Sequence, residues 1–460
     1  MFKVDALKEA TKGCLLHGVP TATVDSLSTD TRNVGPAQAF IALKGERFDG
    51  HTFIAAAIAK GATCVIADSQ YLRTHSSLYA SVDKQRLSVI GVDDTMQAIA
   101  DIARWQRQRF PIPLVAVTGS NGKTTTKEMV AWLLAEKHSV LKNEGTQNNH
   151  IGVPQTLFNL NHTHAWGVLE LGTNHFGEIA YLSKICQPTV GVITNIGLSH
   201  LEFFKNRSGV FKEKFDLARH LIKPSILVVN ADDPFLRKQA VRMQKRFVVS
   251  FGLHNAADFQ AQAITYTAGG ITFTVNKKHT VKLQTFGLHN IYNALAALAV
   301  ARIAGLSYQG VIRALERFEF PRGRFKLVTI NNTKFIDDTY NANPCSMREA
   351  LAAFCSFKNS GRKIFVMGDM LELGRQEEAF HQQVGSQAAQ VCDVLVTVGK
   401  RSRAAAASAL QNGLQKDRIF TCASSSEARS ILYRQIAPTA KDVVLIKGSR
   451  AMNMEAVLSV

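Results

Sequence analysis

The sequence has no long apolar run, no internal repeat and no low-complexity segment. None of its hydrophobic stretches approaches the ~20 residues that a membrane helix needs. With 31 Gly and 11 Pro in 460 residues, a collagen-like or mainly disordered chain is excluded. The first five residues also lack the apolar stretch and small-residue cleavage site of a secretory signal. We therefore expect a globular protein of the cytoplasm that does not insert into a membrane.

Cysteine is scarce, and its spacing argues against both disulfides and zinc. The seven Cys form no CxxC pair and leave one residue over, so most of them are expected to be core residues. Aromatic residues make up only 8% of the chain, and no row of them suggests a stacking platform for nucleic acid. The scarcity of acidic residues is more informative, because 54 basic against 36 acidic side chains give a net charge of +18. A charge of this size is compatible with nucleic acid, a membrane surface or a polyanionic small molecule as partner.

The length of 460 residues corresponds to roughly three domains of about 150 residues. Residues 1–86 alternate short apolar runs with a helical segment, which predicts a small α/β domain. Residues 87–320 repeat a strand–turn–helix pattern, which predicts a doubly wound, mainly parallel sheet. Residues 321–460 begin at Pro321-Arg322-Gly323 and have a βαβ pattern, which predicts a Rossmann-like α/β domain. No GxGxxG follows the strands of this last domain, so nothing there indicates a nicotinamide cofactor.

The strongest motif is a glycine-containing loop between a buried strand and a helix, where residues 117–126 read VTGSNGKTTT. Backbone N–H groups at a helix N-terminus bind phosphate oxygens, a following lysine neutralises the β- and γ-phosphates, and the next hydroxyl ligates Mg²⁺. Val117 replaces the first Gly of the GxxxxGK[ST] consensus, so the loop is of the shorter GxxGKTT type. The motif predicts ATP binding by Gly119, Ser120, Asn121, Gly122, Lys123, Thr124 and Thr125.

Two polar residues, Glu170 and His200, each follow an apolar strand of the predicted central sheet. Because ligands of an open α/β sheet bind beyond the carboxyl ends of its strands, we expect both side chains to lie near Thr124. Together the three residues predict a Mg²⁺ site. Taken singly, each of the two is more typical of a capping or surface residue, and only the combination with the loop favours a metal site.

Four further segments extend the pattern of motifs over the whole chain. They are ALKGERFDGH at 42–51, NNHIGVP at 148–154, DDTYNANPCSM at 337–347 and GDMLELG at 368–374. With the phosphate-binding loop, they resemble the ATP-dependent Mur ligases of peptidoglycan synthesis, and within that family the member that adds D-alanyl-D-alanine. The resemblance implies an enzyme that joins D-alanyl-D-alanine to UDP-N-acetylmuramoyl-tripeptide through an acyl phosphate, with cleavage of ATP to ADP and phosphate. The motifs do not determine the oligomeric state, and we expect a monomer.

The resemblance also assigns roles to individual residues. It implies that ATP is held by the loop together with Asn290, Arg324 and Asp338, although Asn290 also suits a helix N-cap. It implies catalytic roles for Lys123, His200 and Lys214, and metal ligation by Thr124, Glu170, His200 and Lys214. The UDP-linked substrate is expected at Ser28, Thr31, Arg32, Lys44, Asp49, Asn148 and Asn149, with Thr31 where the family pattern usually has Ser.

The role of Lys214 depends entirely on the resemblance, because composition alone predicts a solvated helix face there. Lys214, rather than Lys212, is at the position of the lysine that Mur ligases carry in carbamylated form. A carbamylated lysine is an anion and can ligate a second Mg²⁺, which a free ammonium would repel. The Glu usually found two residues later is Asp216 in this chain.

Two other functions are compatible with parts of the sequence. A ligase similar to folylpolyglutamate synthase would use a similar loop, but the YNANP and KGERFDGH segments argue against it. A basic ATPase acting on nucleic acid would explain the charge, but it would need a basic groove with aromatic residues, of which the sequence shows no sign. For the third residue of the tripeptide, lysine and diaminopimelate fit the motifs equally well.

Overall fold

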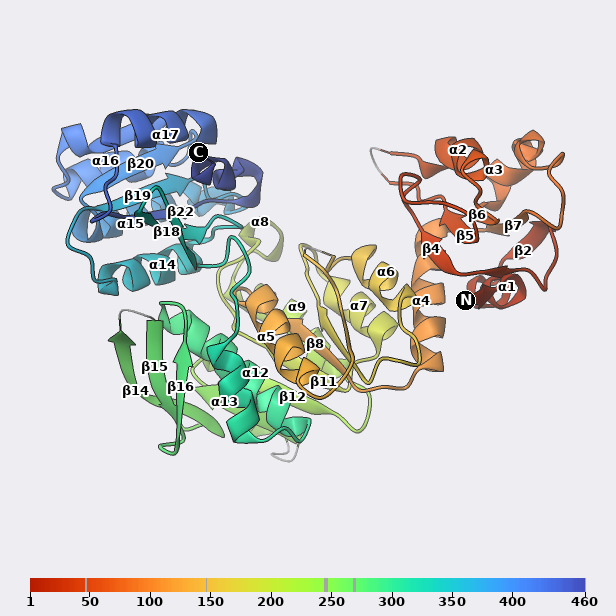
Figure 1. The fold of residues 1–460 in the computed structure, drawn as a ribbon, viewed down its shortest axis with the longest axis horizontal. Coiled ribbons are helices and arrows are strands. Elements are labelled where there is room, and N and C mark those ends of the chain that lie inside the picture. Colours follow the sequence, from red (N-terminus) through yellow and green to blue (C-terminus); the bar gives the residue numbers. More distant parts are fainter. Residues whose placement is uncertain (46–47, 146, 244–246, 268–269, 460) are drawn as a thin grey trace.

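The computed structural model describes residues 1–45, 48–145, 147–243, 247–267 and 270–459. Three α/β domains follow one another along the chain (Figure 1), each built on its own sheet. A central domain lies between a small N-terminal domain and a C-terminal domain. The predicted three-domain α/β architecture, with a mainly parallel central sheet, is confirmed.

The first domain contains a five-stranded sheet in the order β2-β7-β6-β5-β4, in which only β2 is antiparallel to its neighbour. Its strands are β2 Cys14–His17, β4 Ser26–Ser28, β5 Gln38–Ile41, β6 Cys64–Asp68 and β7 Ser88–Val92. The helices are α1 Val4–Thr11, α2 Ile54–Ala59 and α3 Ser69–Thr74, and β1 Phe2–Lys3 pairs with β3 Thr23–Val24. Since β7 pairs between β2 and β6, this sheet extends past the expected boundary at residue 86.

Helix α4 (Thr95–Arg109) connects the first domain to the second. It begins at Asp94, whose carboxylate accepts hydrogen bonds from the N–H groups of Met96 and Gln97. The helix contacts α1 of the first domain and both α6 (Gly152–Phe158) and α7 (Glu178–Cys186) of the central domain. One continuous hydrophobic cluster therefore runs from the first sheet through α4 into the central domain.

The central domain is built on a nine-stranded sheet in the order β16-β15-β14-β13-β12-β11-β8-β10-β9. Its parallel part consists of β8 Leu114–Thr118, β9 Val140–Lys142, β10 Trp166–Glu170, β11 Val190–Ile193, β12 Ile226–Asn230, β13 Val248–Gly252 and β14 Phe259–Thr267. Antiparallel strands β15 Gly270–Val275 and β16 His279–Leu283 extend it at one edge, an extension that the sequence pattern did not predict.

Helices cover both faces of this sheet, as a doubly wound fold requires. Alternate residues of β8 explain the two layers: Leu114 and Ala116 pack with α6 and α7, whereas Val115 and Val117 pack on the opposite face. That second layer (Figure 1) consists of α5 Lys123–Ala135, α12 Leu288–Ile303 and α13 Tyr308–Glu316. Short helices α8 Leu201–Phe204, α9 Arg207–Lys214, α10 Asp216–Arg219 and α11 Pro234–Arg242 complete the domain.

The third domain has a six-stranded sheet in the order β17-β18-β22-β19-β20-β21, parallel except for the edge strand β17. Its strands are β17 Lys326–Ile330, β18 Thr333–Asp338, β19 Lys363–Gly368, β20 Val394–Val398, β21 Ile419–Cys422 and β22 Val443–Lys447. Helices α14 Pro344–Ser356, α15 Glu377–Val391, α16 Arg403–Gln411 and α17 Ser425–Ile431 pack on its two faces, each with its own hydrophobic cluster.

The structure shows the state of the cysteines and the character of the helices, about which the composition gave expectations. All seven cysteines are free, and four of them, Cys64, Cys186, Cys392 and Cys422, are buried core residues. Within the ranges that the structure describes, no helix combines the length and the apolar character needed to cross a membrane.

Candidate active site

A cavity of about 1030 Å³ lies at the carboxyl ends of the central parallel strands. The central domain contributes the phosphate-binding loop and residues that follow β10, β11 and β12. The third domain contributes the opposite wall, which includes Arg324, Asp338, Tyr340 and Lys447. The cavity is thus formed between two domains, a common place for a ligand site.

The phosphate-binding loop between β8 and α5 depends on two glycines. Gly119 and Gly122 have φ angles of +146° and +79°, which side-chain-bearing residues rarely adopt. A Cβ on Gly119 would lie 1.9 Å from Thr194 Oγ1, and one on Gly122 would lie 2.3 Å from Asn293 Oδ1. Both conformation and space therefore require glycine at these positions.

The segment after β11, residues 194–199, lies along the phosphate-binding loop and fixes its conformation. Thr194 Oγ1 donates to the Asn121 carbonyl at 2.6 Å. The Asn195 side chain accepts from Asn121 N at 3.0 Å and donates to Asn121 O at 3.1 Å. Gly197 N donates to Ser120 Oγ at 2.8 Å. The loop is thereby held in shape by hydrogen bonds from the neighbouring segment of the protein.

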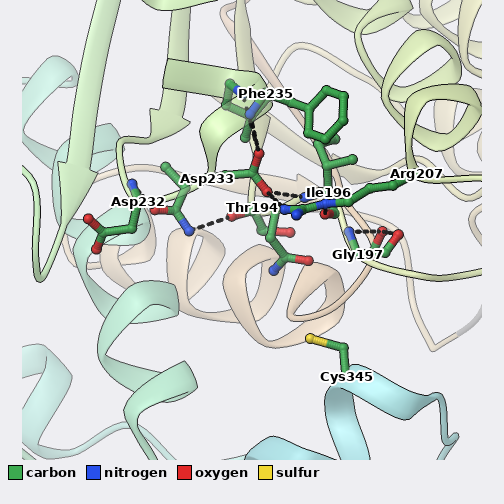
Figure 2. A network of polar contacts seen from close by, with 12 residues as sticks. Thr194, Ile196, Gly197, Arg207, Asp232, Asp233, Phe235 and Cys345 are labelled. Atoms are coloured by element: carbon green, nitrogen blue, oxygen red, sulfur yellow. Dashed lines mark hydrogen bonds and ion pairs between the residues drawn. The ribbon is translucent and has the colours of Figure 1, made fainter. Parts of the chain in front are cut away.

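An ion pair between the buried Asp233 and the partly exposed Arg207 holds the other side of this segment, as Figure 2 shows. Asp233 Oδ2 accepts from Ile196 N at 2.8 Å and from Arg207 Nη2 at 3.1 Å. Arg207 Nε donates to the Ile196 carbonyl at 2.6 Å. The same carboxylate caps α11 by accepting from Phe235 N and Leu236 N. Residue 196 is therefore fixed at both its N–H and its carbonyl.

Lys123, Thr124 and Glu170 lie together beside the loop. Lys123 Nζ donates to the Gly119 carbonyl at 2.9 Å, so its side chain folds back over the loop. Burial lowers the pKa of Lys123, while the charge of Glu170 acts in the opposite direction. Thr124 Oγ1 donates to Glu170 Oε2 at 2.7 Å, and Asn148 Nδ2 donates to Glu170 Oε1 at the same distance. Both oxygens of the Glu170 carboxylate are thus held in place.

The third domain reaches this group through Arg324 and Asn343. Arg324 Nη2 donates to Thr124 Oγ1 at 2.8 Å, and its guanidinium lies 3.6 Å from the centre of the Tyr340 ring. Asn343 Nδ2 donates to Asn121 Oδ1 at 2.7 Å. Arg324, expected from the sequence to contribute to the ATP site, therefore lies in direct contact with the phosphate-binding loop.

Asp338, also expected at the ATP site, lies on the same wall and pairs with Lys447. Lys447 Nζ donates to Asp338 Oδ2 at 2.6 Å. Burial raises the pKa of Asp338, against the lowering effect of the Lys447 and Arg324 charges. Lys447 was missed in the sequence, although it ends β22 at the same sheet edge where the other polar residues lie.

His200 lines the cavity, but it contacts the third domain instead of Thr124 or Glu170. Its Nδ1 lies 2.6 Å from Glu372 Oε2, and that hydrogen bond lowers the pKa of Glu372. The residue has a left-handed backbone conformation, with φ of 51°. In the part of the chain that the structure describes, no group of three His, Cys, Asp or Glu side chains is placed to hold a metal ion. The structure thus brings Thr124 and Glu170 together and directs His200 elsewhere.

Lys214 lies at the end of α9 and is buried, with 1% of its surface exposed. Burial, together with the nearby charge of Lys123, lowers its pKa well below the ordinary value for lysine. Lys212, two positions earlier, is exposed. The solvated helix face that composition predicts is therefore correct for Lys212 and wrong for Lys214.

Asn290 lies in the part of the cavity formed by α12 and the residues after β12. The N-cap of α12 is Gly287, so the alternative role of Asn290 as an N-cap is wrong. Its amide instead donates to Thr285 Oγ1 and to the Phe286 carbonyl, both at 3.2 Å. Close to it, Tyr292 donates to Asp232 Oδ2 at 2.8 Å, and burial and this bond raise the pKa of Tyr292.

Several cavity residues were not identified in the sequence. Asn195 and Asp232 follow β11 and β12, so the rule that located Glu170 could have located them as well. Tyr292 and Asn343 lie within helical or turn segments whose role depends on the packing of two domains. Asn343 belongs to the DDTYNANPCSM segment, but nothing local in the sequence shows that its side chain or that of Tyr292 faces the cavity.

The five first-domain residues expected to bind the UDP end do not line the large cavity. Ser28 and Arg32 instead bond with Asp30 in one loop, with Arg32 Nη2 2.7 Å from Asp30 Oδ2. Lys60 Nζ donates to the Thr31 carbonyl at 2.8 Å. Lys44 and Asp49 form a β-bridge, and residues 46–47 of the KGERFDGH segment lie outside the described residues.

Asn148 and Asn149, in contrast, line the cavity. They lie directly before α6, and Gln155 of that helix donates to Thr29 Oγ1 of the first domain at 2.5 Å. Helix α6 therefore contacts the first-domain loop at 28–32, and the turn before this helix reaches the carboxylate of Glu170.

The residues present fit a nucleoside triphosphate with Mg²⁺. Two glycines remove side chains from the path of the phosphates, and Lys123 and Arg324 supply positive charge. The Asn121 side-chain amide nitrogen is buried and has no hydrogen-bond partner among the described residues, so it is available to a ligand. Hydroxyl and carboxylate oxygens of Thr124 and Glu170, 2.7 Å apart, are donors that Mg²⁺ prefers.

Family profiles match each of the three domains. The Mur ligase middle domain matches residues 117–301, the Mur ligase glutamate ligase domain matches 323–450, and the catalytic domain of the Mur ligase family matches 23–107. The chain belongs to the Mur ligase family. The family resemblance noted in the sequence is thereby confirmed.

This Mur ligase is similar over nearly its whole length to proteins whose activity is named. It is 34% identical to the UDP-N-acetylmuramoyl-tripeptide--D-alanyl-D-alanine ligase of Bacillus subtilis, over 99% of this chain and 97% of that protein. MurF from Acinetobacter baumannii superposes with a TM-score of 0.86 at 32% identity, covering 99% and 98% of the two chains. MurF from Thermotoga maritima, solved in complex with ADP, gives a TM-score of 0.81 at 30% identity, covering 94% and 96%.

Proposed function

We propose that this Mur ligase joins D-alanyl-D-alanine to UDP-N-acetylmuramoyl-tripeptide, with cleavage of ATP to ADP and phosphate. The observation that carries the proposal is the phosphate-binding loop in contact with both Glu170 and Arg324, so that two domains meet at one reaction centre. The similarity to ligases of this activity over nearly the full length supports the choice of substrates.

The chemistry requires activation of a carboxylate, because a carboxylate and an amine do not condense in water at a useful rate. Transfer of the γ-phosphoryl group to the tripeptide carboxylate gives an acyl phosphate. The amine of the dipeptide then attacks the carbonyl carbon, and phosphate leaves. Both steps depend on positioning and on charge stabilisation, which Lys123 and Arg324 supply from opposite sides of the cavity.

Each predicted site residue has a place in this proposal. Thr124 and Glu170 would hold Mg²⁺, which offsets phosphate charge when bound, and His200 and Lys214 would complete the metal set once the substrates are present. The phosphate-binding loop would hold the phosphates, and Asn290 with Asp338 the remainder of ATP. Ser28, Thr31, Arg32, Lys44 and Asp49 would bind the UDP end, with Asn148 and Asn149 next to the peptide. Contact between the two domains excludes water from the acyl phosphate.

We also propose that the enzyme works as a monomer in the cytoplasm. One chain supplies both walls of the cavity, and its cysteines are free, as is usual for a reducing compartment. Size-exclusion chromatography with light scattering tests the first statement, since a dimer would have twice the mass of 50.4 kDa. Cell fractionation tests the second.

Phosphate release measured with a panel of UDP-muramoyl peptides, each with and without D-alanyl-D-alanine, tests the reaction. We expect release only with a tripeptide and the dipeptide together, and the product should have the mass of the pentapeptide. Lys123→Ala provides the control, since it removes the ammonium from the loop and should abolish turnover without unfolding the protein. Release stimulated by a folate and glutamate, or by DNA or RNA, would contradict the proposal.

A further inference from the structure

Lys127 is a fully buried lysine to which the proposed chemistry gives no role. It lies one turn after Lys123 on α5, and none of its surface is exposed. Its ammonium donates to the Asn143 carbonyl at 2.6 Å and pairs with Glu128. Burying an ammonium is costly unless partners replace its water, so the contact to Asn143 is a specific one.

Asn143, also fully buried, lies directly after β9 and carries this contact to Glu170. Its side chain accepts from Glu170 N at 2.9 Å and donates to Glu170 O at 3.0 Å. The pairing of strand β9 with β10 ends at Lys142 and Val168. Beyond that pair, the side-chain amide of Asn143 makes the hydrogen bonds to β10 that a backbone peptide group of β9 would otherwise make. The N–H and the carbonyl of Glu170 therefore both bond to one side chain, on the side of β10 opposite to its pairing with β8.

Asn143 also fixes the carboxylate of Glu170, through the turn that follows. Its amide donates to the Gln147 carbonyl at 2.7 Å. The next residue, Asn148, donates to Glu170 Oε1, while Thr124 on α5 donates to Oε2. Lys127 thus connects the helix that carries Thr124 to the turn that carries Asn148, and Glu170 lies between the two.

We propose that Lys127 is a positioning residue: through the Asn143 carbonyl, its ammonium sets the place of the Glu170 carboxylate and thereby the affinity of the site for a divalent cation. The inference rests on the proposed function, because it takes Glu170 as a ligand of Mg²⁺. Groups that orient metal ligands typically change metal affinity by about 10- to 100-fold when they are mutated.

Calorimetric titration with ADP, in EDTA and again in Mg²⁺, separates metal binding from nucleotide binding. For Lys127→Met, we expect the affinity for ADP in EDTA to stay within about twofold of the wild-type affinity. The factor by which Mg²⁺ increases the affinity for ADP should fall at least tenfold. Lys142→Met is the matched control, because Lys142 pairs with the same Glu128 without contacting the Asn143 carbonyl. It should resemble the wild type in both titrations.

A second variant covers the case in which Lys127→Met does not fold, as urea unfolding would reveal. Asn143→Asp keeps the size of the side chain but turns a carboxylate oxygen toward the carbonyls of Gln147 and Glu170, so it should show the same metal-specific loss. Equal losses in EDTA and in Mg²⁺, or no loss in either variant, would overturn the inference. Glu170→Gln serves as a reference variant, because it changes the proposed metal ligand itself. If only Glu170→Gln shows the metal-specific loss, the role of Lys127 is refuted. If the wild-type enzyme does not join the dipeptide to the tripeptide, the proposed function is refuted.

Discussion

Lys212 and Lys214 lie two positions apart on α9 in opposite environments. Lys214 is buried, and its lowered pKa favours the neutral amine. A neutral amine is the form that adds to carbon dioxide to give a carbamate, with release of a proton, and the resulting anion would attract a metal ion near Glu170. We expect Lys214→Ala to lose most ligase activity and to regain part of it with added formate or acetate.

Lys212→Ala is the control for this experiment, because the exposed Lys212 ammonium makes no hydrogen bond or ion pair with a described residue and lies 5.7 Å from the centre of the Phe176 ring. It should stay active and should not respond to formate. Loss of activity in Lys212→Ala with normal activity in Lys214→Ala would contradict the assignment of Lys214.

Asp442, next to β22, gives a pH dependence that can be measured without substrates. Burial works to raise the pKa of Asp442, but hydrogen bonds from Arg362 and from the Thr439 N–H outweigh it and lower the pKa from 3.8 to about 2. A depressed carboxyl pKa contributes stability above about pH 4, and this contribution is lost as the pH falls toward 2.

We expect Asp442→Asn to lower the free energy of unfolding at pH 7 by about 2 kcal/mol. This value follows from the lowering of the Asp442 pKa, because each pKa unit corresponds to roughly 1.4 kcal/mol. The difference from wild type should disappear near pH 2. Urea titrations at several pH values measure both effects. If the wild type and Asp442→Asn still differ in free energy of unfolding by the same amount at low pH, the packing of Asp442, and not its charge, accounts for its contribution.

At the scale of elements, α14 has an N-terminus that serves two purposes. Asn343 forms a capping box with Ser346, and its amide also donates to Asn121 in the phosphate-binding loop. Asn343→Ala should cost about 1 kcal/mol of stability and should also raise the KM for ATP. Ser346→Ala removes the other half of the box without touching Asn121. It should cause a similar loss of stability, measured by urea unfolding, with an unchanged KM.

The elements differ in how far the sequence determines them. The buried parallel strands were predictable, since short β-branched runs such as 190–193 are buried on both faces and carry no polar alternation. The edge hairpin β15–β16 was not predicted, although β15 begins at Gly270 and buries alternate residues, because its place at the edge of the central sheet depends on pairing with β14. Strand β7 was placed in the wrong domain, since pattern alone does not reveal which neighbours a strand pairs with.

The same distinction applies to the candidate site. Gly119, Lys123 and Glu170 were found because a loop and a strand end have local signatures. The contact of His200 with Glu372 joins residues 172 positions apart on two domains, and no local pattern predicts it. Lys127 has no local signature in the sequence, and its burial and its contact with the Asn143 carbonyl are known only from the structure.

At the scale of the whole molecule, the net charge of +18 requires an explanation. If the positive charge attracts UDP, ATP and an acidic peptide, the affinity of the protein for generic duplex DNA should be weak. This affinity should also fall steeply with salt, because non-specific DNA binding depends on the release of counterions. Fluorescence anisotropy with a labelled duplex at 50 and 200 mM salt measures this. Binding that resists salt and depends on DNA sequence would favour a nucleic-acid function.

Helix α4 packs between the first domain and the central domain within one large hydrophobic cluster. Among the described residues, the third-domain clusters take in a single buried residue of the central domain, Phe286, with Tyr266 packed against it. Residues that share one core lose their packing together, so the first two domains should behave as a single cooperative unit in unfolding. Scanning calorimetry should then show two transitions for three domains. Limited proteolysis near Pro321 should release a stable N-terminal fragment, while a cut before α4 should leave neither half folded.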